Sequence, residues 1–175
     1  MRTATFALFF GIAYLSAGLL GMTPAALMPP PANAPPTTFT VLYGYLLGVF
    51  PVNVLHSAVH LAIGAWGIAA WRSDHLGRGL GSPKTYARVL AIFYSALAVA
   101  GVIPGMNTLF GLLPLHGHDV WLHAATAAIA GYFGWRTEIV VERRTNGIDR
   151  REQVVPVDQE RRLGHSDRRI PGSEV

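Results

Sequence analysis

The chain of 175 residues contains no cysteine, which excludes disulfide bonds, thiolate catalysis, cysteine-ligated zinc and iron–sulfur clusters. Carboxylates are nearly absent from most of it, because Asp74 and Asp119 are the only ones between Arg2 and Trp135. Charged residues make up 14% of the sequence and hydrophobic residues 51%, a balance too apolar for an ordinary soluble domain. The remaining charges gather from Arg136 onward with both signs interleaved, so the net charge of +4 predicts no nucleic-acid partner.

Long apolar runs are what the sequence does contain. A membrane-spanning helix needs about 20 predominantly apolar residues, and four stretches meet this requirement: residues 3–22, 51–71, 86–104 and 119–135. They predict an all-α fold, an integral membrane bundle of four transmembrane helices. We place this domain at residues 1–140. Residues 141–175 lose the apolar periodicity, and we expect them to form a disordered cytoplasmic tail.

Lysine and arginine lie on only one side of these four spans. The two connecting segments on the other side, residues 23–50 and 105–118, contain neither. By the positive-inside tendency, both termini are expected in the cytoplasm. The sequence therefore predicts a multi-pass protein of the plasma membrane, with the lipid bilayer as its partner.

Two of the apolar stretches align with each other without a gap, residues 46–72 on residues 109–135. The alignment pairs Gly48 with Gly111, Pro51 with Pro114, His60 with His123 and His56 with Asp119. A weaker similarity joins residues 17–22 to residues 100–106 in the preceding helices. We predict a tandem, parallel repeat of a helical hairpin, with halves related by a pseudo-two-fold axis along the membrane normal. Chance similarity of two helices rich in alanine, glycine and leucine is the alternative.

The repeat places polar side chains inside the spans, where ionisable groups are costly and by default indicate function. His60 lies twelve residues from Arg72 and His123 thirteen from Arg136, which at the helical rise is about 18 and 20 Å from the inner boundary. Helical spacing puts further polar residues on the same faces, and these faces must point inward because lipid cannot satisfy them. The predicted polar cluster consists of Asn53, His56, His60, Asp119 and His123.

Three interpretations of this cluster remain open from the sequence. The first is a hydrogen-bond network that fixes helix register, which membrane bundles use routinely. The second is a metal or haem site, because histidines at i and i+4 can share one ion and facing histidines can ligate haem. The haem ligands would be His60 and His123, and the candidate ligands of a divalent metal are His56, His60, His116, His118, Asp119 and His123. The third is a proton-sensing or small-solute site.

No catalytic constellation accompanies the cluster. Ser57 follows His56 but projects about 100° away from it around the helix. The glycine-rich residues 77–81 lack the lysine of a phosphate-binding loop. We therefore expect an integral membrane protein of undetermined role and no enzyme. Small residues on the helix faces would also permit a homo-oligomer.

Two motifs resemble those of a bacterial family of small four-helix membrane proteins filed as a domain of unknown function. They read FPVNVLHxxxHxxxGxxG from Phe50 to Gly67 and FGLLPLHGHDxxLH from Phe110 to His123. The resemblance covers about residues 1–140 and implies a four-span integral membrane protein. It implies that the five residues of the polar cluster are motif positions, and it implies no activity, cofactor or ligand.

Overall fold

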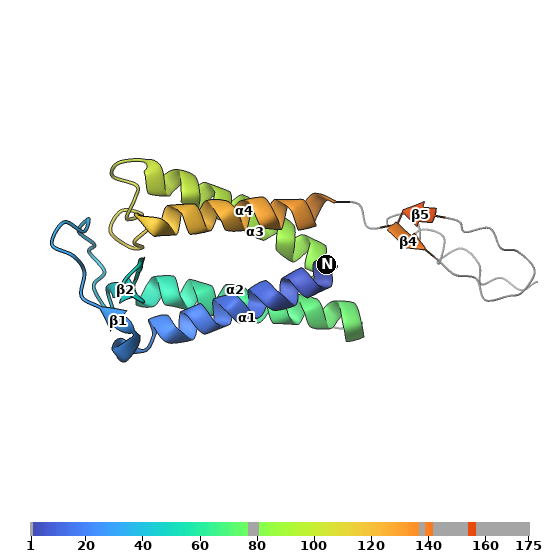
Figure 1. Cartoon of the computed structure of the whole chain (residues 1–175), viewed down its shortest axis with the longest axis horizontal. Helices are drawn as coiled ribbons and strands as arrows, with labels where there is room; N and C mark the ends of the chain where they lie inside the picture. The colour runs from blue at the N-terminus through green and yellow to red at the C-terminus, as the bar shows by residue number, and fades with distance from the viewer. Residues whose placement is uncertain (1, 77–80, 137–138, 142–153, 157–175) are drawn as a thin grey trace, which may run out of the picture. The chain divides into compact units, whose positions relative to one another are not determined.

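The computed structural model describes residues 2–76, 81–136, 139–141 and 154–156. The chain divides into two units, Met1–Trp135 and Arg136–Val175. The first is mainly helical, with α1 (Thr3–Gly21), α2 (Val54–Leu76), α3 (Pro83–Val102) and α4 (His118–Trp135) (Figure 1). In the second, the described residues include the paired strands β4 (Ile139–Val141) and β5 (Val154–Pro156). We predicted a disordered tail at residues 141–175. Of this tail the structure describes residue 141 and residues 154–156, and the other residues lie outside the described part.

The four helices occupy the four predicted apolar stretches, with shifts of a few residues at their ends. The helix α2 begins at Val54, later than the predicted 51, because residues 50–52 form a strand. The helix α3 begins at Pro83, earlier than the predicted 86. There Ser82 accepts a hydrogen bond from the backbone N–H of Thr85, and a proline follows at the first helical position. Both features are typical of a helix N-terminus.

Three of the helices are long and apolar enough to cross a membrane: α1, α2 as far as Ser73, and α3. The helix α4 falls below this level of apolarity. Its 18 residues include two histidines and one aspartate, His118, Asp119 and His123. The described residues thus contain three candidate spans by length and composition, where the sequence predicted four.

The helices pack as two hairpins, α1 with α2 and α3 with α4 (Figure 1). Contacts between the hairpins are sparser and are made mainly by α1 with α3 and by α2 with α3. Aromatic rings carry much of this interface. Phe6 stacks on Phe133 with ring centroids 4.8 Å apart, and Tyr14 stacks on Tyr94 at 5.2 Å. All four side chains are buried, so they fix how the hairpins meet.

The loop end of the bundle is where α1 and α3 finish and where α2 and α4 begin. The long connection from α1 to α2 contains a 3₁₀ turn (Pro24–Ala26) and the strands β1 (Leu27–Met28), β2 (Gly44–Leu46) and β3 (Phe50–Val52). These strands form one antiparallel sheet in the order β1-β2-β3. The all-α prediction missed them because strands of two or three residues are too short to show an alternating pattern.

Candidate metal centre

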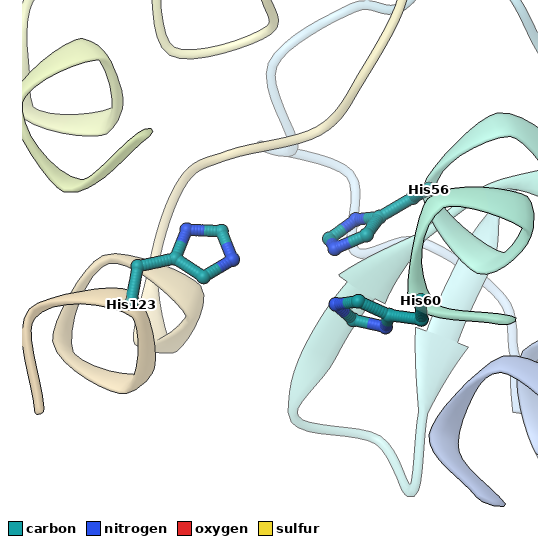
Figure 2. Close-up of side chains that lie close together, drawn as sticks. All are labelled: His56, His60 and His123. Atoms are coloured by element: carbon teal, nitrogen blue, oxygen red, sulfur yellow. The ribbon is translucent and has the colours of Figure 1, made fainter. Parts of the chain in front are cut away.

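Three histidine side chains meet between α2 and α4, near the loop end of the bundle. His56 and His60 project from α2 and His123 from α4, and Figure 2 shows the three rings turned toward one another. All three are buried. One ring nitrogen can be chosen from each so that all three atoms lie within 4.8 Å of one another. The helical spacing of i and i+4 on α2 makes two of these rings neighbours, with centroids 4.5 Å apart.

Asp119 lies one turn before His123 on α4 and joins the histidines. Its Oδ2 atom is 3.4 Å from Nε2 of His123 and 3.8 Å from Nε2 of His56. The residue is only 1% exposed. Each hairpin therefore contributes one pair of polar side chains at i and i+4. The structure brings together four of the five residues of the predicted polar cluster: His56, His60, Asp119 and His123.

Several buried polar atoms of this group have no hydrogen-bond partner. Among the described residues, neither ring nitrogen of His123 has a hydrogen-bond partner, and neither has Oδ2 of Asp119. Leaving a buried polar atom unpaired costs about 1–3 kcal/mol. A network that served only to fix helix register would pair these atoms. The geometry therefore favours an interaction partner other than the protein, and nitrogen and carboxylate oxygen are metal ligands.

Asn53, the fifth residue of the predicted cluster, makes side-chain hydrogen bonds to backbone groups around the site. Its Oδ1 atom accepts a hydrogen bond from the backbone N–H of His56 at 2.9 Å, which caps α2. Its Nδ2 atom donates to the carbonyl oxygens of Leu112 at 2.7 Å and Phe39 at 3.1 Å. Phe39 N–H in turn donates to the Gly111 carbonyl at 3.0 Å. Asn53 is thus a positioning residue that ties the loops of the two hairpins together.

We expect Asn53→Ala to lower the free energy of unfolding by about 2–3 kcal/mol. This sums the loss of an N-cap, about 1 kcal/mol, and of two side-chain hydrogen bonds of about 1 kcal/mol each. Thermal unfolding of the full chain in detergent measures the change. Asn107→Ala is the control, because the Asn107 side chain makes no hydrogen bond in the part of the chain that the structure describes. Equal melting temperatures for the two variants would show that the Asn53 contacts contribute nothing.

The two remaining candidate ligands, His116 and His118, are not part of the group. His116 is 8% exposed and lies beside the ring of Tyr45, with centroids 6.3 Å apart. Its burial lowers its pKa. His118 is exposed at the start of α4. Gly117, with φ of +69°, lies between them, and neither histidine belongs to the group whose ring nitrogens lie close enough to share one ion.

The packing around the histidines fits an ion better than a haem. The ring of His60 contacts Tyr14 at 5.2 Å, and the ring of His123 contacts Tyr94 at 5.0 Å. Tyr14 and Tyr94 stack on each other, and His56 contacts both other histidines. The five rings thus form a closed circuit of contacts. A macrocycle ligated by His60 and His123 would have to displace these side chains, so the haem interpretation does not fit this geometry.

Sequence reasoning missed Tyr14 and Tyr94 as neighbours of the site. A signal was available, because α1 and α3 share identical residues when Tyr14 is placed on Tyr94. In this register the identical pairs are Thr5 with Thr85, Ala7 with Ala87, Ile12 with Ile92, Tyr14 with Tyr94 and Gly21 with Gly101. The predicted similarity of residues 17–22 to 100–106 placed Gly18 on Gly101, which is three residues away from this register.

The contacts of two glycines, one in each hairpin, agree with the register that aligns Tyr14 with Tyr94. A Cβ atom on Gly21 would meet Val52 and Ser57, and one on Gly101 would meet Leu115 and Val120. The gapless alignment pairs Val52 with Leu115 and Ser57 with Val120.

The loops repeat an unusual backbone conformation as well. Leu47 and Gly48 have φ of +54° and +73°, and the aligned Phe110 and Gly111 have +59° and +86°. Left-handed conformations are uncommon for leucine and phenylalanine, so their recurrence at aligned positions is informative.

The chain matches the family described as Domain of unknown function (DUF4383) over residues 4–136. No curated protein and no solved structure matches the chain. The matched range begins one residue after the start of α1, includes the rest of the four helices and the three histidines of the site, and ends beside the boundary between the two units.

Proposed function

The chain belongs to the DUF4383 family, whose description states no function, and we propose that it is an integral membrane protein that binds one divalent transition-metal ion between its two hairpins. The ligands are His56, His60 and His123, with Asp119 as the fourth. One observation carries this proposal: ring nitrogens of three buried histidines lie within 4.8 Å of one another, beside a buried carboxylate oxygen that has no hydrogen bond among the described residues.

The distances support tetrahedral coordination. Zinc binds nitrogen and oxygen at about 2.0–2.1 Å, so two ligand atoms of a tetrahedral site lie about 3.4 Å apart. The separation of Nε2 of His123 from Oδ2 of Asp119 is 3.4 Å. The histidine nitrogens are at most 4.8 Å apart, and small rotations of the rings bring them closer. Three imidazoles and one carboxylate suit zinc, copper, iron or nickel, whereas magnesium and calcium prefer oxygen ligands.

The ligands also suggest what the ion does. Two of them come from the first hairpin and two from the second, and the hairpins otherwise share few contacts. An ion bound by all four therefore fastens the hairpins to each other. Binding to the folded chain alone adds stability, about 2.7 kcal/mol when the free ion is at 100 times its dissociation constant.

We place all four helices across the plasma membrane, with both termini in the cytoplasm. Two of the three polar residues that lower the apolarity of α4, Asp119 and His123, are buried at the site, and the exposed large hydrophobic side chains of α4 are Trp121, Leu122, Ile129, Tyr132 and Trp135. The segments without lysine or arginine then lie outside the cell. The repeated glycine contacts and loop conformations support an origin by duplication of one hairpin, inserted twice in the same orientation.

Metal analysis of the purified full chain tests this function. We expect about one equivalent of a transition metal per chain by elemental mass spectrometry. After the metal is stripped, added Co²⁺ should give the intense visible absorption bands of tetrahedral cobalt. A chain that retains no metal, and that gives no such bands with Co²⁺, would overturn the proposal.

A further inference from the structure

His116 is a buried imidazole close to the proposed metal site, but it lies outside the group that can share one ion. Its side chain is 8% exposed, and its Nε2 atom has no hydrogen-bond partner among the described residues. Buried polar atoms in native proteins are nearly always paired, so an exception calls for an explanation. The four proposed ligands of the ion do not include this side chain, and its role is therefore a separate question.

The chain places His116 between the surface and the metal site. The two residues before it are buried, and the two residues after it are exposed. The backbone of Pro114, two residues earlier, lies beside the ring of His56. Asp119 follows three residues later in the first turn of α4. Because a chain advances at most about 3.6 Å per residue, the Cα atoms of His116 and Asp119 lie within about 11 Å of each other.

The charges of the chain favour the approach of a cation from the loop end of the bundle. The two connecting segments at that end, residues 23–50 and 105–118, contain no lysine or arginine. Basic residues lie instead at the opposite ends of the helices, and they include Arg2, Arg72, Lys84 and Arg88. A cluster of positive charge lowers the local concentration of cations. A metal ion therefore meets less repulsion at the loop end.

Apolar side chains fill the bundle between the site and the basic end. Phe133 lies ten residues beyond His123 on α4, about 15 Å along the helix. Its ring stacks on that of Phe6 of α1 with centroids 4.8 Å apart, and Leu90 of α3 belongs to the same buried cluster. These three side chains offer no ligand atom to a metal ion. The loop end, where His116 lies, is therefore the more favourable route to the site.

We propose that the ion enters the site from the loop end and that His116 is its entry ligand, which binds the incoming ion and passes it to His56 and Asp119. Imidazole nitrogen suits the transition metals that fit the site. A ligand on the route lets the ion exchange its water molecules stepwise, which lowers the barrier to entry. Because His116 does not ligate the ion once it is bound, it speeds entry and release by the same factor. This inference rests on the proposed function of the site.

Rates of Co²⁺ uptake by the metal-free full chain in detergent test this inference. Stopped-flow mixing follows the visible bands of tetrahedral cobalt. We expect His116→Ala to slow uptake about tenfold, a modest change in the barrier. Release to an excess of chelator should slow by the same factor, so the dissociation constant should equal that of the wild type. His118→Ala is the matched control, because it removes an exposed histidine two residues away and should leave both rates unchanged.

A second variant keeps the test decisive if His116→Ala does not fold. His116→Gln retains a polar side chain but removes the imidazole, and it should slow uptake and release in the same way. Uptake at the wild-type rate by a folded His116 variant would overturn the inference and leave the metal site standing. So would weaker Co²⁺ binding with unchanged uptake, because His116 would then ligate the bound ion, and so would equal slowing in His118→Ala. A wild type that binds no Co²⁺ would overturn both the inference and the proposed function.

Discussion

Replacing His123 by alanine should abolish metal retention and weaken binding of added Co²⁺ by more than about 100-fold. Changes in the outer shell of a metal site typically cost 10–100-fold in affinity, and this substitution removes a direct ligand. It also removes the only histidine that the second hairpin contributes to the group. Elemental analysis and a Co²⁺ titration of the full chain measure the two effects. His60→Ala should behave in the same way, because it removes one of the two histidines of α2.

His118→Ala is the matched control for this experiment. It removes a histidine from the same helix, but His118 is exposed and lies outside the group that can share an ion. Metal content and Co²⁺ affinity should be those of the wild type. Equal metal content in His118→Ala and His123→Ala would contradict the assignment of the ligands.

Chelation separates the metal site from a purely structural histidine network. If an ion fastens the hairpins, a chelator should lower the melting temperature of the wild type and leave that of His123→Ala unchanged. If the histidines serve only as polar contacts between helices, His123→Ala should lower the melting temperature and the chelator should affect neither protein. The two roles thus give opposite results with the same reagent.

Gly64→Ala should destabilise the first hairpin by up to about 2 kcal/mol, because α1 and α2 touch at this residue. A Cβ atom at Gly64 would overlap the backbone nitrogen of Leu15 and lie 2.8 Å from the carbonyl oxygen of Gly11. These are backbone atoms, so the helices themselves would have to move apart, and such overpacking costs about 1–3 kcal/mol. The better helix propensity of alanine offsets only about 1 kcal/mol. Thermal unfolding in detergent measures the loss.

The same substitution at Gly131 provides the comparison. A Cβ atom there would lie 3.9 Å from Cβ of Ala91, which is ordinary van der Waals contact. Gly131→Ala should therefore leave the melting temperature unchanged or raise it, since only the helix propensity changes. A loss of stability as large as that of Gly64→Ala would show that close approach of the helices is not the cause.

The positions of the helices could be predicted because each is a long apolar run bounded by loop residues. The observed α1, Thr3–Gly21, and α4, His118–Trp135, differ from the predicted 3–22 and 119–135 by one residue at one end. That His56 and His60 lie close to Asp119 and His123 could also be predicted from the residue spacing along the helices. Pairs at i and i+4 share one helix face, and polar faces in a membrane bundle turn toward each other.

Other parts of the site could not be predicted, because they depend on where the chain turns and on contacts distant in the sequence. His116 and His118 lie within three residues of Asp119, yet neither belongs to the group of histidines that could share one ion. Tyr14 and Tyr94 lie far along the sequence from the histidines and reach them only because the hairpins dock. The strands of the loop end arise from pairing between segments that are separately too short to show a pattern.

The sequence by itself therefore determined the helical segments, their apolar character and the helix faces that carry histidine and aspartate. Composition and residue spacing are local properties of a helix, so a single amino-acid sequence is enough to recognise them. The tertiary structure alone decided which side chains share a site and that Tyr14 and Tyr94 pack against its histidines. These outcomes depend on the volumes of side chains that meet across the two hairpins, and no local pattern contains that information.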